Sequence, residues 1–346
     1  MTAAAHQGAP VRPRVAVLGA GAWGSAMALV LADAGADVRL WARRPELAAR
    51  IGRDPLRPQN PDYLPGVVLP PTVSATADVG VALDGVELVV LAVPLQRLRE
   101  QLTGWAGRIP AVPVVSLAKG VETATGRFAT EVVLEASGVP EDRVVALSGP
   151  NLAAEIAARD PAATVLACVD EDVAHRVADL CTTPVFRPYL STDRIGVDIA
   201  GACKNVVALA VGITEGAGHG ANARAAILTR GLAETTRLGL ALGANESTFA
   251  GLAGVGDLVA TCASPLSRNH RAGIALGRGA STAEALLAAR GTAEGVASAP
   301  AVLARARAAG VRMPITVEVV ALVEGRTTAA EGAERLLSRT RTLDGP

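Results

Sequence analysis

Short apolar runs alternate with helical stretches along the first half of the chain. The runs at residues 14–19, 37–42, 87–92, 113–117 and 143–147 are rich in Val, Leu and Ala, and each is short enough to be a buried strand. A helix is expected over residues 22–34, because Gly35 follows it at the position where helices commonly end. Strands that alternate with helices predict βαβ units and a parallel sheet covered on both faces. We therefore expect a doubly wound α/β domain over residues 12–189.

The pattern changes near residue 190. After the segment 183–188 the β-like runs stop, and the sequence to the end is rich in Ala, helical in its period and punctuated by Gly. This predicts an all-α domain over residues 190–346. A Pro-rich stretch at 54–71 is expected to form a long loop, and loops of that length in compact domains often serve a site.

Composition excludes several kinds of partner. The 346 residues carry 33 basic and 33 acidic side chains, so no bulk charge attracts nucleic acid or an anionic membrane. The four cysteines form no C-x-x-C pair and are expected to be free thiols in a reducing compartment. The four histidines are scattered, so no metal site is expected, and a G-x-S-x-G nucleophile motif is absent. With no apolar stretch near ~20 residues and no secretory signal, we expect a cytoplasmic protein without a membrane span.

The strongest local motif is Gly19-Ala-Gly21-Ala-Trp-Gly24, a G-x-G-x-x-G that follows an expected strand and opens an expected helix. Gly19 suits the tight turn, Gly21 lets the backbone approach a pyrophosphate, and Gly24 lets helix and strand pack closely. The free N–H groups of the helix N-terminus then face the phosphates. This context predicts a Rossmann-like dinucleotide-binding domain.

The end of the second expected strand indicates which dinucleotide is bound. NAD-binding domains commonly place an acid there, on the ribose 2′-OH, but this chain has Arg43 and Arg44. Arginines at this place can pair with a 2′-phosphate, so NADP is favoured over NAD. The alternative is that both arginines stack on adenine or lie in solvent, and that both cofactors are accepted.

Lysine is rare in this chain, which uses arginine almost everywhere else. Only Lys119 and Lys204 are lysines among the 33 basic residues. Lys204 lies in a helical pattern over 193–215 that is apolar on most sides. An ammonium in such surroundings is costly unless it is paired or used in chemistry. We therefore expect a functional Lys204, although a lysine that extends to solvent remains the alternative.

Two further segments carry candidate chemistry. Asp257 follows the glycine-rich turn Gly254-Val-Gly256, where it could position a substrate hydroxyl or Lys204, or simply cap the next helix. Ser267, Arg268 and Asn269 open another helix that ends near Gly277. Such residues at a helix N-terminus can bind a phosphate, and simple capping is equally compatible with the pattern.

Taken together, the motifs resemble the NAD(P)-dependent glycerol-3-phosphate dehydrogenase family of the bacterial type. The resemblance covers the chain from Val15 to about Ala321. The motifs that carry it are Gly19–Ala26, Tyr63-Leu-Pro-Gly66, Ala92-Val-Pro94, Ser116-Leu-Ala-Lys119-Gly120, Ser148-Gly-Pro-Asn151, Ala202-Cys-Lys204-Asn205, Gly256-Asp257-Leu258, Ser267-Arg-Asn269 and Ala293-Glu294-Gly295. Several are weak alone, but their order and spacing are together specific.

The resemblance implies a role for each matching residue. Lys204 corresponds to the catalytic proton donor and acceptor, and Lys119 to a contact with both substrate and cofactor. The resemblance assigns the substrate to Gly149, Asn151, Asp257, Ser267, Arg268 and Asn269. It assigns the dinucleotide to Ala22, Trp23, Arg43, Arg44, Ala153, Arg268, Thr292 and Glu294, in addition to the three glycines and Lys119. Asn151, Cys203 and Thr292 depart modestly from the family pattern.

The implied reaction is the reduction of dihydroxyacetone phosphate by NADPH or NADH to sn-glycerol 3-phosphate, and its reverse. The resemblance also implies a role in supplying glycerol phosphate for phospholipids. Lys204 would stabilise the negative charge that grows on the ketone oxygen and deliver a proton. A homodimer is possible, and the sequence leaves open the oligomeric state, the NADP-to-NAD ratio, feedback regulation and the physiological direction.

Two other functions remain open at this point. A 3-hydroxyacid or ketopantoate type of dehydrogenase shares the layout and a helix lysine, but it would need a carboxylate site rather than the phosphate site predicted around Arg268. A non-catalytic NADP-binding regulator would keep the glycines and have no use for Lys204 in an apolar helix.

Overall fold

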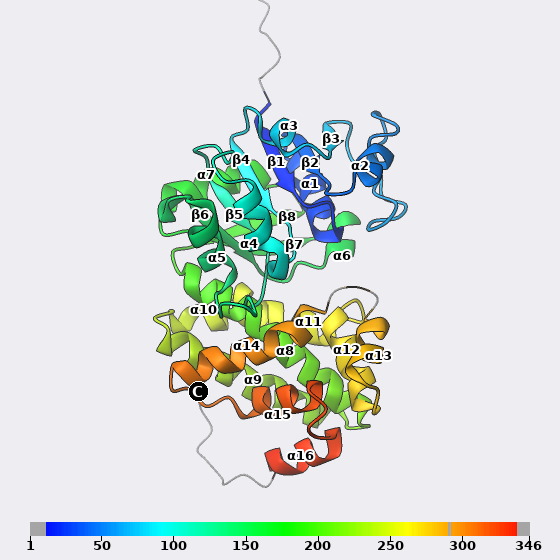
Figure 1. The fold of residues 1–346 in the computed structure, drawn as a ribbon, viewed down its shortest axis with the longest axis vertical. Coiled ribbons are helices and arrows are strands. Elements are labelled where there is room, and N and C mark those ends of the chain that lie inside the picture. The colour runs from blue at the N-terminus through cyan, green and yellow to red at the C-terminus, as the bar shows by residue number, and fades with distance from the viewer. Residues whose placement is uncertain (1–11, 290, 292, 338–346) are drawn as a thin grey trace, which may run out of the picture.

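The chain folds into a sheet-containing part and a helical part that lie one above the other (Figure 1). The computed structural model describes residues 12–289, 291 and 293–337. All strands of these described residues lie in the N-terminal part, and their longest helix, α8, begins the C-terminal part. The predicted fold class, a Rossmann-like sheet domain followed by a helical domain, is confirmed.

The sheet has eight strands in the order β3-β2-β1-β4-β5-β6-β7-β8. Their bounds are β1 Arg14–Leu18, β2 Asp37–Trp41, β3 Val73–Thr76, β4 Leu88–Leu91, β5 Val114–Ser116, β6 Val144–Ser148, β7 Ala162–Ala167 and β8 Phe186–Ser191. Strands β1 to β6 are parallel, while β7 runs antiparallel to β6 and pairs in parallel with β8. The order of the first strands therefore reverses between β1 and β4, which is the point where doubly wound sheets bind ligands.

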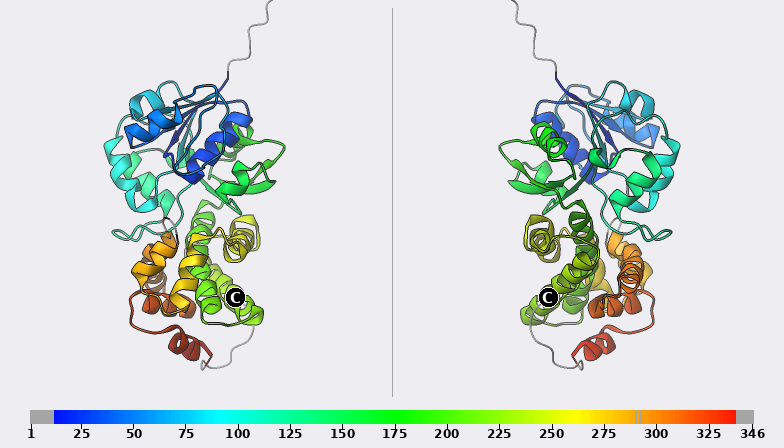
Figure 2. Two further views of the ribbon diagram at one scale, coloured as in Figure 1. Left: turned by 90° about the vertical axis from the view of Figure 1, so that its right-hand side faces the viewer. Right: turned by 90° about the vertical axis from the view of Figure 1, so that its left-hand side faces the viewer.

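Both faces of this sheet are buried under helices (Figure 2). Val15 and Val17 of β1 pack on the face covered by α1 Ala22–Asp33, α2 Pro45–Ile51, α6 Ala153–Ala157 and α7 Glu171–Cys181. Ala16 and Leu18 pack on the opposite face, covered by α3 Val79–Leu83, α4 Leu95–Gly104 and α5 Ala129–Ser137. This two-sided burial explains why β1 is an uninterrupted apolar run rather than an alternating one.

The five predicted strands are confirmed, but the sequence pattern missed three others. β3 and β8 are the two edge strands of the sheet, and most β8 side chains are partly or fully exposed. β8 also contains Pro188, which is tolerated at an edge because one ladder N–H can be absent there. The expectation that strands end before residue 190 was therefore slightly wrong, since β8 continues to Ser191. The predicted loop at 54–71 is present, with only an isolated bridge between Gln59 and Val68.

The C-terminal part is built around α8, Arg194–Gly216. The helices that follow it are α9 Ala221–Ala241, α10 Glu246–Ala250, α11 Asp257–Ala263, α12 Arg268–Gly277, α13 Thr282–Ala288, α14 Glu294–Ala308, α15 Pro314–Val323 and α16 Ala329–Leu337. By length and composition alone α8 could cross a membrane, but 89% of its most apolar window is buried inside the protein. Its apolar surface therefore forms the core of the helical part.

Candidate active site

The candidate residues of the N-terminal part gather at one edge of the sheet. Gly19 follows β1, Arg43 follows β2, Ala92 follows β4, Lys119 follows β5 and Gly149 follows β6. Because these strands are parallel, their carboxyl ends meet at the same edge. The helical part lies directly beyond the sheet on this side of the molecule (Figure 1).

The glycine turn lies at the reversal between β1 and β4. Gly19 has φ +129°, and a Cβ there would lie 2.5 Å from the carbonyl oxygen of Ala92. A Cβ on Gly24 would lie 1.9 Å from the carbonyl oxygen of Gly19, so helix α1 could not approach the strand with any larger residue. Gly21, by contrast, faces open space. Two glycines therefore let the turn pack tightly, and the third leaves its surface bare beside the first N–H groups of α1, which fits a pyrophosphate.

The two arginines after β2 differ in their surroundings. Arg44 is the N-terminal cap residue of α2 and forms an ion pair of 2.6 Å with Asp62, which also pairs with Arg50. Arg43 is exposed and forms no side-chain hydrogen bond or ion pair with a described residue. Arg43 is therefore the more available of the two for a cofactor phosphate, whereas Arg44 would have to share its guanidinium with Asp62.

The two lysines of the chain meet on a single buried carboxylate. The ammonium nitrogen of Lys119 lies 2.6 Å from Oδ2 of Asp257, and that of Lys204 pairs with Oδ1. Asp257 is 1% exposed, and the lysine side chains are 14% and 12% exposed. Of the alternatives left open for Asp257, simple helix capping does not apply, because its side chain binds both lysines and the cap position belongs to Gly256.

The local backbone explains how Asp257 reaches this position. A π-helical turn, Leu252–Gly256, precedes α11 and points the chain toward α8. A Cβ on Gly254 would lie 2.1 Å from the carbonyl oxygen of Phe249, so this turn requires glycine. π-Helical turns often mark functional sites because they displace one side chain from the regular helical register.

The charged groups of this cluster shift one another's pKa values. Burial lowers the pKa of Lys204 to about 8, although the charge of Asp257 acts in the opposite direction. Burial acts to raise the pKa of Asp257, but the two ammonium groups outweigh it and hold that pKa below its ordinary value. Asp257 is therefore ionised at neutral pH. Lys204 has a pKa near neutral pH, so it can exist both as the ammonium, which gives a proton, and as the amine, which accepts one.

The N-terminus of α12 supplies a separate cation. Arg268 is exposed and forms no side-chain hydrogen bond with a described residue, and Gly291 leaves room for its side chain. Ser267 caps the helix by accepting the N–H of His270 at 3.2 Å. Asn269 is already used, because it donates to Asn205 at 2.9 Å and accepts from the N–H of Gly295 at 3.0 Å. Of the three residues, Arg268 is the one left free to bind an anion.

Most of the remaining predicted cofactor residues lie at the starts of helices. Ala22 and Trp23 open α1, Ala153 opens α6, and Glu294 opens α14. Burial raises the pKa of Glu294, against the opposing effects of Arg268 and of the backbone N–H of Leu95. Glu294 thus links α12 and α14 to the start of α4. Thr292 lies outside the described residues.

Gly149 contacts Lys119, and Asn151 lies two residues further along the same loop. The carbonyl oxygen of Gly149 accepts a hydrogen bond of 3.4 Å from Lys119. The amide of Asn151 donates to Thr164 at 2.8 Å, which leaves its oxygen buried without a partner among the described residues. The hydroxyl of Ser116, at the end of β5, is also buried without such a partner. Unsatisfied buried polar atoms are uncommon in folded proteins.

Sequence reasoning missed several polar residues of the cluster. Thr261 accepts a hydrogen bond of 2.9 Å from Lys204 and donates one of 2.6 Å to the backbone oxygen of Asp257. Ser148 donates to Asp257 at 3.3 Å. Asn60, from the 54–71 loop, donates to the oxygen of Ala20 at 2.9 Å and so supports the glycine turn. Of these residues, only Ser148 belonged to a recognised motif, and no role was assigned to it.

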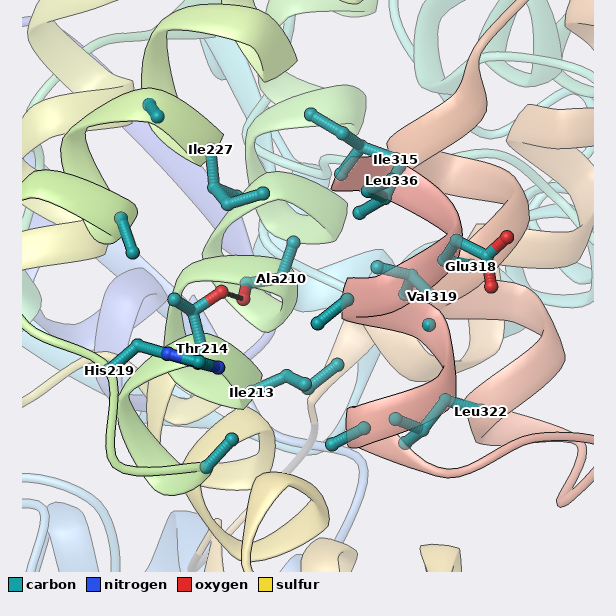
Figure 3. A pocket seen from close by; sticks show the side chains of 16 residues that line it. Ala210, Ile213, Thr214, His219, Ile227, Ile315, Glu318, Val319, Leu322 and Leu336 are labelled. Atoms are coloured by element: carbon teal, nitrogen blue, oxygen red, sulfur yellow. Dashed lines mark hydrogen bonds between the residues drawn. The ribbon is translucent and has the colours of Figure 1, made fainter. Parts of the chain in front are cut away.

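One pocket lies away from this cluster. It is formed in the helical part by α8, α9, α15 and α16, and its walls include Ile213, Ile227, Ile315 and Leu322 (Figure 3). None of the lysine-pair or glycine-turn residues lines it. Among the described residues, no group of three or more His, Cys, Asp or Glu side chains could hold a metal ion.

The fold and the site together define a Rossmann-type, NAD(P)-dependent oxidoreductase with a helical second part. Family models described as the N-terminus and C-terminus of NAD-dependent glycerol-3-phosphate dehydrogenase match residues 14–174 and 193–334. The chain therefore belongs to the NAD-dependent glycerol-3-phosphate dehydrogenase family, as its motifs predicted.

Individual relatives agree with this assignment. The chain is 54% identical over 258 residues to a glycerol-3-phosphate dehydrogenase (NAD(P)+) of Streptomyces griseus, covering 74% of this chain and 76% of the relative. The crystal structure of glycerol-3-phosphate dehydrogenase from Coxiella burnetii has 36% identity and a TM-score of 0.89, covering 95% of this chain and 99% of that one. A ketopantoate reductase from Ralstonia eutropha, at 19% identity and a TM-score of 0.57 over 92% and 99% of the two chains, shares the fold alone.

Proposed function

We propose that this enzyme interconverts dihydroxyacetone phosphate and sn-glycerol 3-phosphate with a nicotinamide dinucleotide. The observation that carries the proposal is the pair of lysines on the buried Asp257, placed at the carboxyl edge of a sheet with a dinucleotide-binding turn. When bound, the dinucleotide supplies or accepts the hydride at the carbon that changes oxidation state. The protein has to orient the substrate and manage one proton and the developing charge.

Lys204 is the residue we assign to the proton. In the reducing direction the ketone oxygen gains negative charge, and the Lys204 ammonium donates its proton to that oxygen. In the oxidising direction the neutral amine accepts the hydroxyl proton. Because the pKa of Lys204 is about 8, both forms are accessible near neutral pH.

Lys119 and Asp257 complete the site. Asp257 holds both ammonium groups on its two oxygens, which fixes their separation. Lys119 adds a second positive charge near the substrate. It lies at the carboxyl edge of the sheet, where it can also contact the cofactor. We assign the substrate backbone to Gly149 and Asn151, whose unpartnered amide oxygen can accept a hydrogen bond from a hydroxyl.

Arg268 is assigned to the substrate phosphate. It lies at a helix N-terminus, its guanidinium forms no hydrogen bond with a described residue, and a fork of N–H donors suits a phosphate. Ser267 can contribute its hydroxyl while it caps the helix, whereas Asn269 supports the site through Asn205 and Gly295.

The experiment follows NADPH oxidation with dihydroxyacetone phosphate and with unphosphorylated dihydroxyacetone. We expect turnover with the first and a large loss of kcat/KM with the second. Arg268→Lys keeps the charge and loses the fork, so it should raise KM for the phosphorylated ketone; Arg271→Lys on the same helix is the control. No turnover with any ketone would favour a non-catalytic dinucleotide-binding protein, and an unchanged preference in Arg268→Ala would place the phosphate elsewhere.

We further propose that NADPH is preferred over NADH, because Arg43 has no side-chain partner among the described residues at the position where an NAD-binding domain has an acid.

The reaction would take place in the cytoplasm and supply glycerol phosphate for phospholipids. The four cysteines, all free and buried, suit a reducing compartment. The division between a dinucleotide-binding and a substrate-binding domain is proposed near residue 190, between the last strand and α8. A homodimer is compatible with this function.

A further inference from the structure

Lys119 projects from a loop rather than from a helix or a strand. It follows β5 and precedes a turn that leads into α5. A long side chain on a loop has considerable freedom, yet its ammonium lies 2.6 Å from Asp257 in the other half of the molecule. Catalytic groups must be held closely in place, since small displacements can cost large factors in rate. The loop therefore needs a support that is independent of Asp257.

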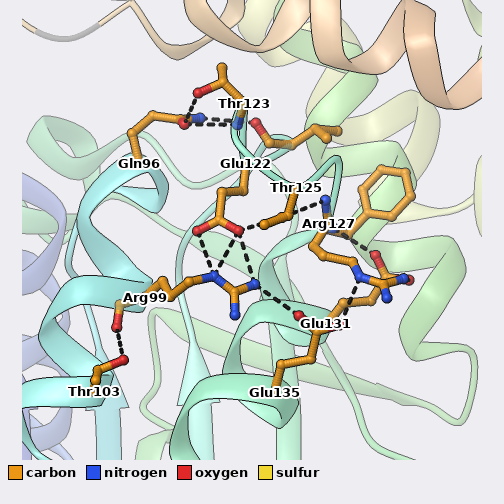
Figure 4. Close-up of polar contacts among 11 residues, drawn as sticks. Gln96, Arg99, Thr103, Glu122, Thr123, Thr125, Arg127, Glu131 and Glu135 are labelled. Atoms are coloured by element: carbon orange, nitrogen blue, oxygen red, sulfur yellow. Dashed lines mark hydrogen bonds and ion pairs between the residues drawn. The ribbon is translucent and has the colours of Figure 1, made fainter.

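An ion pair between Arg99 and the buried carboxylate of Glu122 provides this support (Figure 4). Glu122, on the same loop, is 5% exposed and accepts two hydrogen bonds from Nε of Arg99, at 3.1 and 3.0 Å. A second nitrogen of Arg99 lies 2.9 Å from Glu122 and 2.9 Å from Glu135 of α5. The hydroxyl of Thr125 also donates to Glu122.

The backbone around Glu122 is fixed as well. The N–H of Glu122 donates to the oxygen of Arg127 at 2.8 Å, and its own oxygen accepts from Gly126 at 2.8 Å. From α4, Gln96 donates to the oxygen of Val121 at 2.9 Å and accepts from the N–H of Thr123 at 3.0 Å (Figure 4). Helix α4 therefore holds the loop at two successive turns, through Gln96 and Arg99.

The opposite side of the loop rests on the helical part. Gly120, directly after Lys119, has φ +129°, and a Cβ there would lie 2.6 Å from the hydroxyl of Ser298 on α14. That hydroxyl accepts the N–H of Val121 at 3.4 Å. The loop is thus clamped between α4 and α14, and a shift of Glu122 would move Lys119 along with it.

We propose that the Arg99–Glu122 pair is a positioning device that sets the Lys119 ammonium against Asp257. The Glu122 carboxylate loses its solvation on burial, although 32% of the Arg99 side chain stays exposed. Stability alone is therefore a weak reason for the pair. The inference rests on the proposed function, because Lys119 is assigned there to the active site. It adds two residues that touch neither substrate nor cofactor.

The pair can be tested without measuring activity, because the chain has only two lysines. Labelling with 13C at the lysine ε-carbon gives one signal for each lysine, and a Lys119→Arg variant assigns them. In Glu122→Gln the Lys119 signal should shift or broaden. Glu100→Gln is the control, since Glu100 lies on α4 in the ion pair with Arg97, where both side chains are 64% exposed. An unchanged Lys119 signal in a folded Glu122→Gln protein would overturn the proposal.

Kinetics provide the second readout. Glu122→Gln should lower kcat for the ketone by ~10-fold or more, while the Kd for NADPH stays within about twofold of the wild type. In a Lys119→Ala protein, Glu122→Gln should cause little further loss of kcat, because the effects of coupled residues are not additive. Independent, multiplying losses would contradict the proposal. If Glu122→Gln does not fold, Arg99→Lys takes its place in the same comparison with Lys119→Ala. A wild-type enzyme without turnover would refute the proposed function, and the lysine signals would still decide the role of the pair.

Discussion

At the residue scale, the proposed mechanism depends on what a lysine can do that an arginine cannot. Arginine stays protonated at any working pH, whereas a buried lysine can exchange its proton. Lys204 and Lys119 are the only lysines in a chain with 33 basic residues, and both lie on Asp257. The scarcity of lysine in the sequence therefore pointed to these two positions.

The pKa of Lys204 predicts opposite pH dependences for the two directions. Reduction needs the ammonium, so its kcat/KM should fall as pH rises through about 8, while oxidation needs the amine and should rise through about 8. Asp257→Asn removes the charge that raises this pKa, so both inflections should move to lower pH, with reduced turnover. Initial rates from pH 6 to 10 in both directions provide the measurement, and parallel profiles would contradict the assignment.

Lys204→Arg should lose at least ~10²-fold in kcat, since its guanidinium cannot give up a proton.

Arg43 and Arg44 are expected to differ in their effect on the cofactor. Arg43→Gln should weaken NADPH binding by roughly 1–3 kcal/mol, the value of a charge-assisted contact, and leave NADH binding nearly unchanged. Arg44→Gln, which removes a guanidinium already paired with Asp62, is the matched comparison and should have a smaller effect. Fluorescence titration with both cofactors measures this. Equal losses for NADPH and NADH in Arg43→Gln would show that no 2′-phosphate is bound there.

At the scale of elements, the position of Arg268 relative to Lys204 depends on how closely α12 crosses α8. Four glycines lie at this crossing. A Cβ on Gly212 would lie 2.3 Å from the oxygen of His270, and one on Gly273 would lie 2.3 Å from the oxygen of Leu209. Gly216 and Gly277 have similarly short approaches, both of 2.2 Å. The backbones of the two helices are therefore in direct contact, which places the N-terminal end of α12, with Arg268, against the helix that carries Lys204.

Gly273→Ala should force the helices apart. We expect a loss of about 1–3 kcal/mol in the free energy of unfolding from overpacking, partly offset by the better helix propensity of Ala. KM for the phosphorylated substrate should rise, because Arg268 moves with α12. Gly104→Ala in α4 is the control: a Cβ there meets nothing within 4 Å, and the change should be neutral or stabilising. Urea unfolding of both variants checks this, and equal stability would argue against a close crossing.

At the scale of the whole molecule, the sheet and the helices are joined around α5. The buried carboxylate of Asp198, on α8, accepts the N–H of Thr130 at 2.8 Å and its hydroxyl at 2.6 Å, and so caps α5 from the other half of the chain. Arg305 of α14 forms an ion pair of 2.9 Å with Glu131 and lies over the ring of Phe128. These contacts fix α8, and with it Lys204, relative to the loop of Lys119.

The Asp198 contact predicts part of the pH dependence of stability. Burial raises the pKa of Asp198 from 3.8 to about 6, against the opposing hydrogen bonds of Thr130 and the charge of Arg194, while the charge of Glu131 adds to the rise. Between these values the folded state keeps a proton that the unfolded state has lost. The contribution of Asp198 to stability is therefore present below pH 4 and is lost as pH rises to about 6.

Asp198→Asn should remove this dependence, so its stability relative to wild type should increase between pH 4 and 6 and then stay constant. Asp172→Asn, at an exposed position of α7, is the control and should not change the difference. Denaturant unfolding at pH 4, 5, 6 and 7 gives the comparison. A constant difference across this range would mean that Asp198 does not hold a proton in the folded protein.

The sequence by itself determined the fold class and the glycine turn, and it singled out the two lysines that the proposed mechanism uses. Buried parallel strands are continuous apolar runs, and G-x-G-x-x-G has a meaning tied to the turn that it forms, so both can be recognised locally. The edge strands β3 and β8 were not predicted, because an edge strand buries only part of its surface and has a weaker pattern of apolar residues.

Only the tertiary structure decided which side chains pair. Asp257, Lys119 and Lys204 are far apart in sequence, and nothing local distinguishes an Asp that caps a helix from one that binds two lysines. The same holds for Arg43 and Arg44, which differ only because Asp62 from the following loop reaches one of them. Local sequence determines the backbone through short-range sterics and burial, whereas ion pairs and close helix contacts depend on segments that meet only after folding.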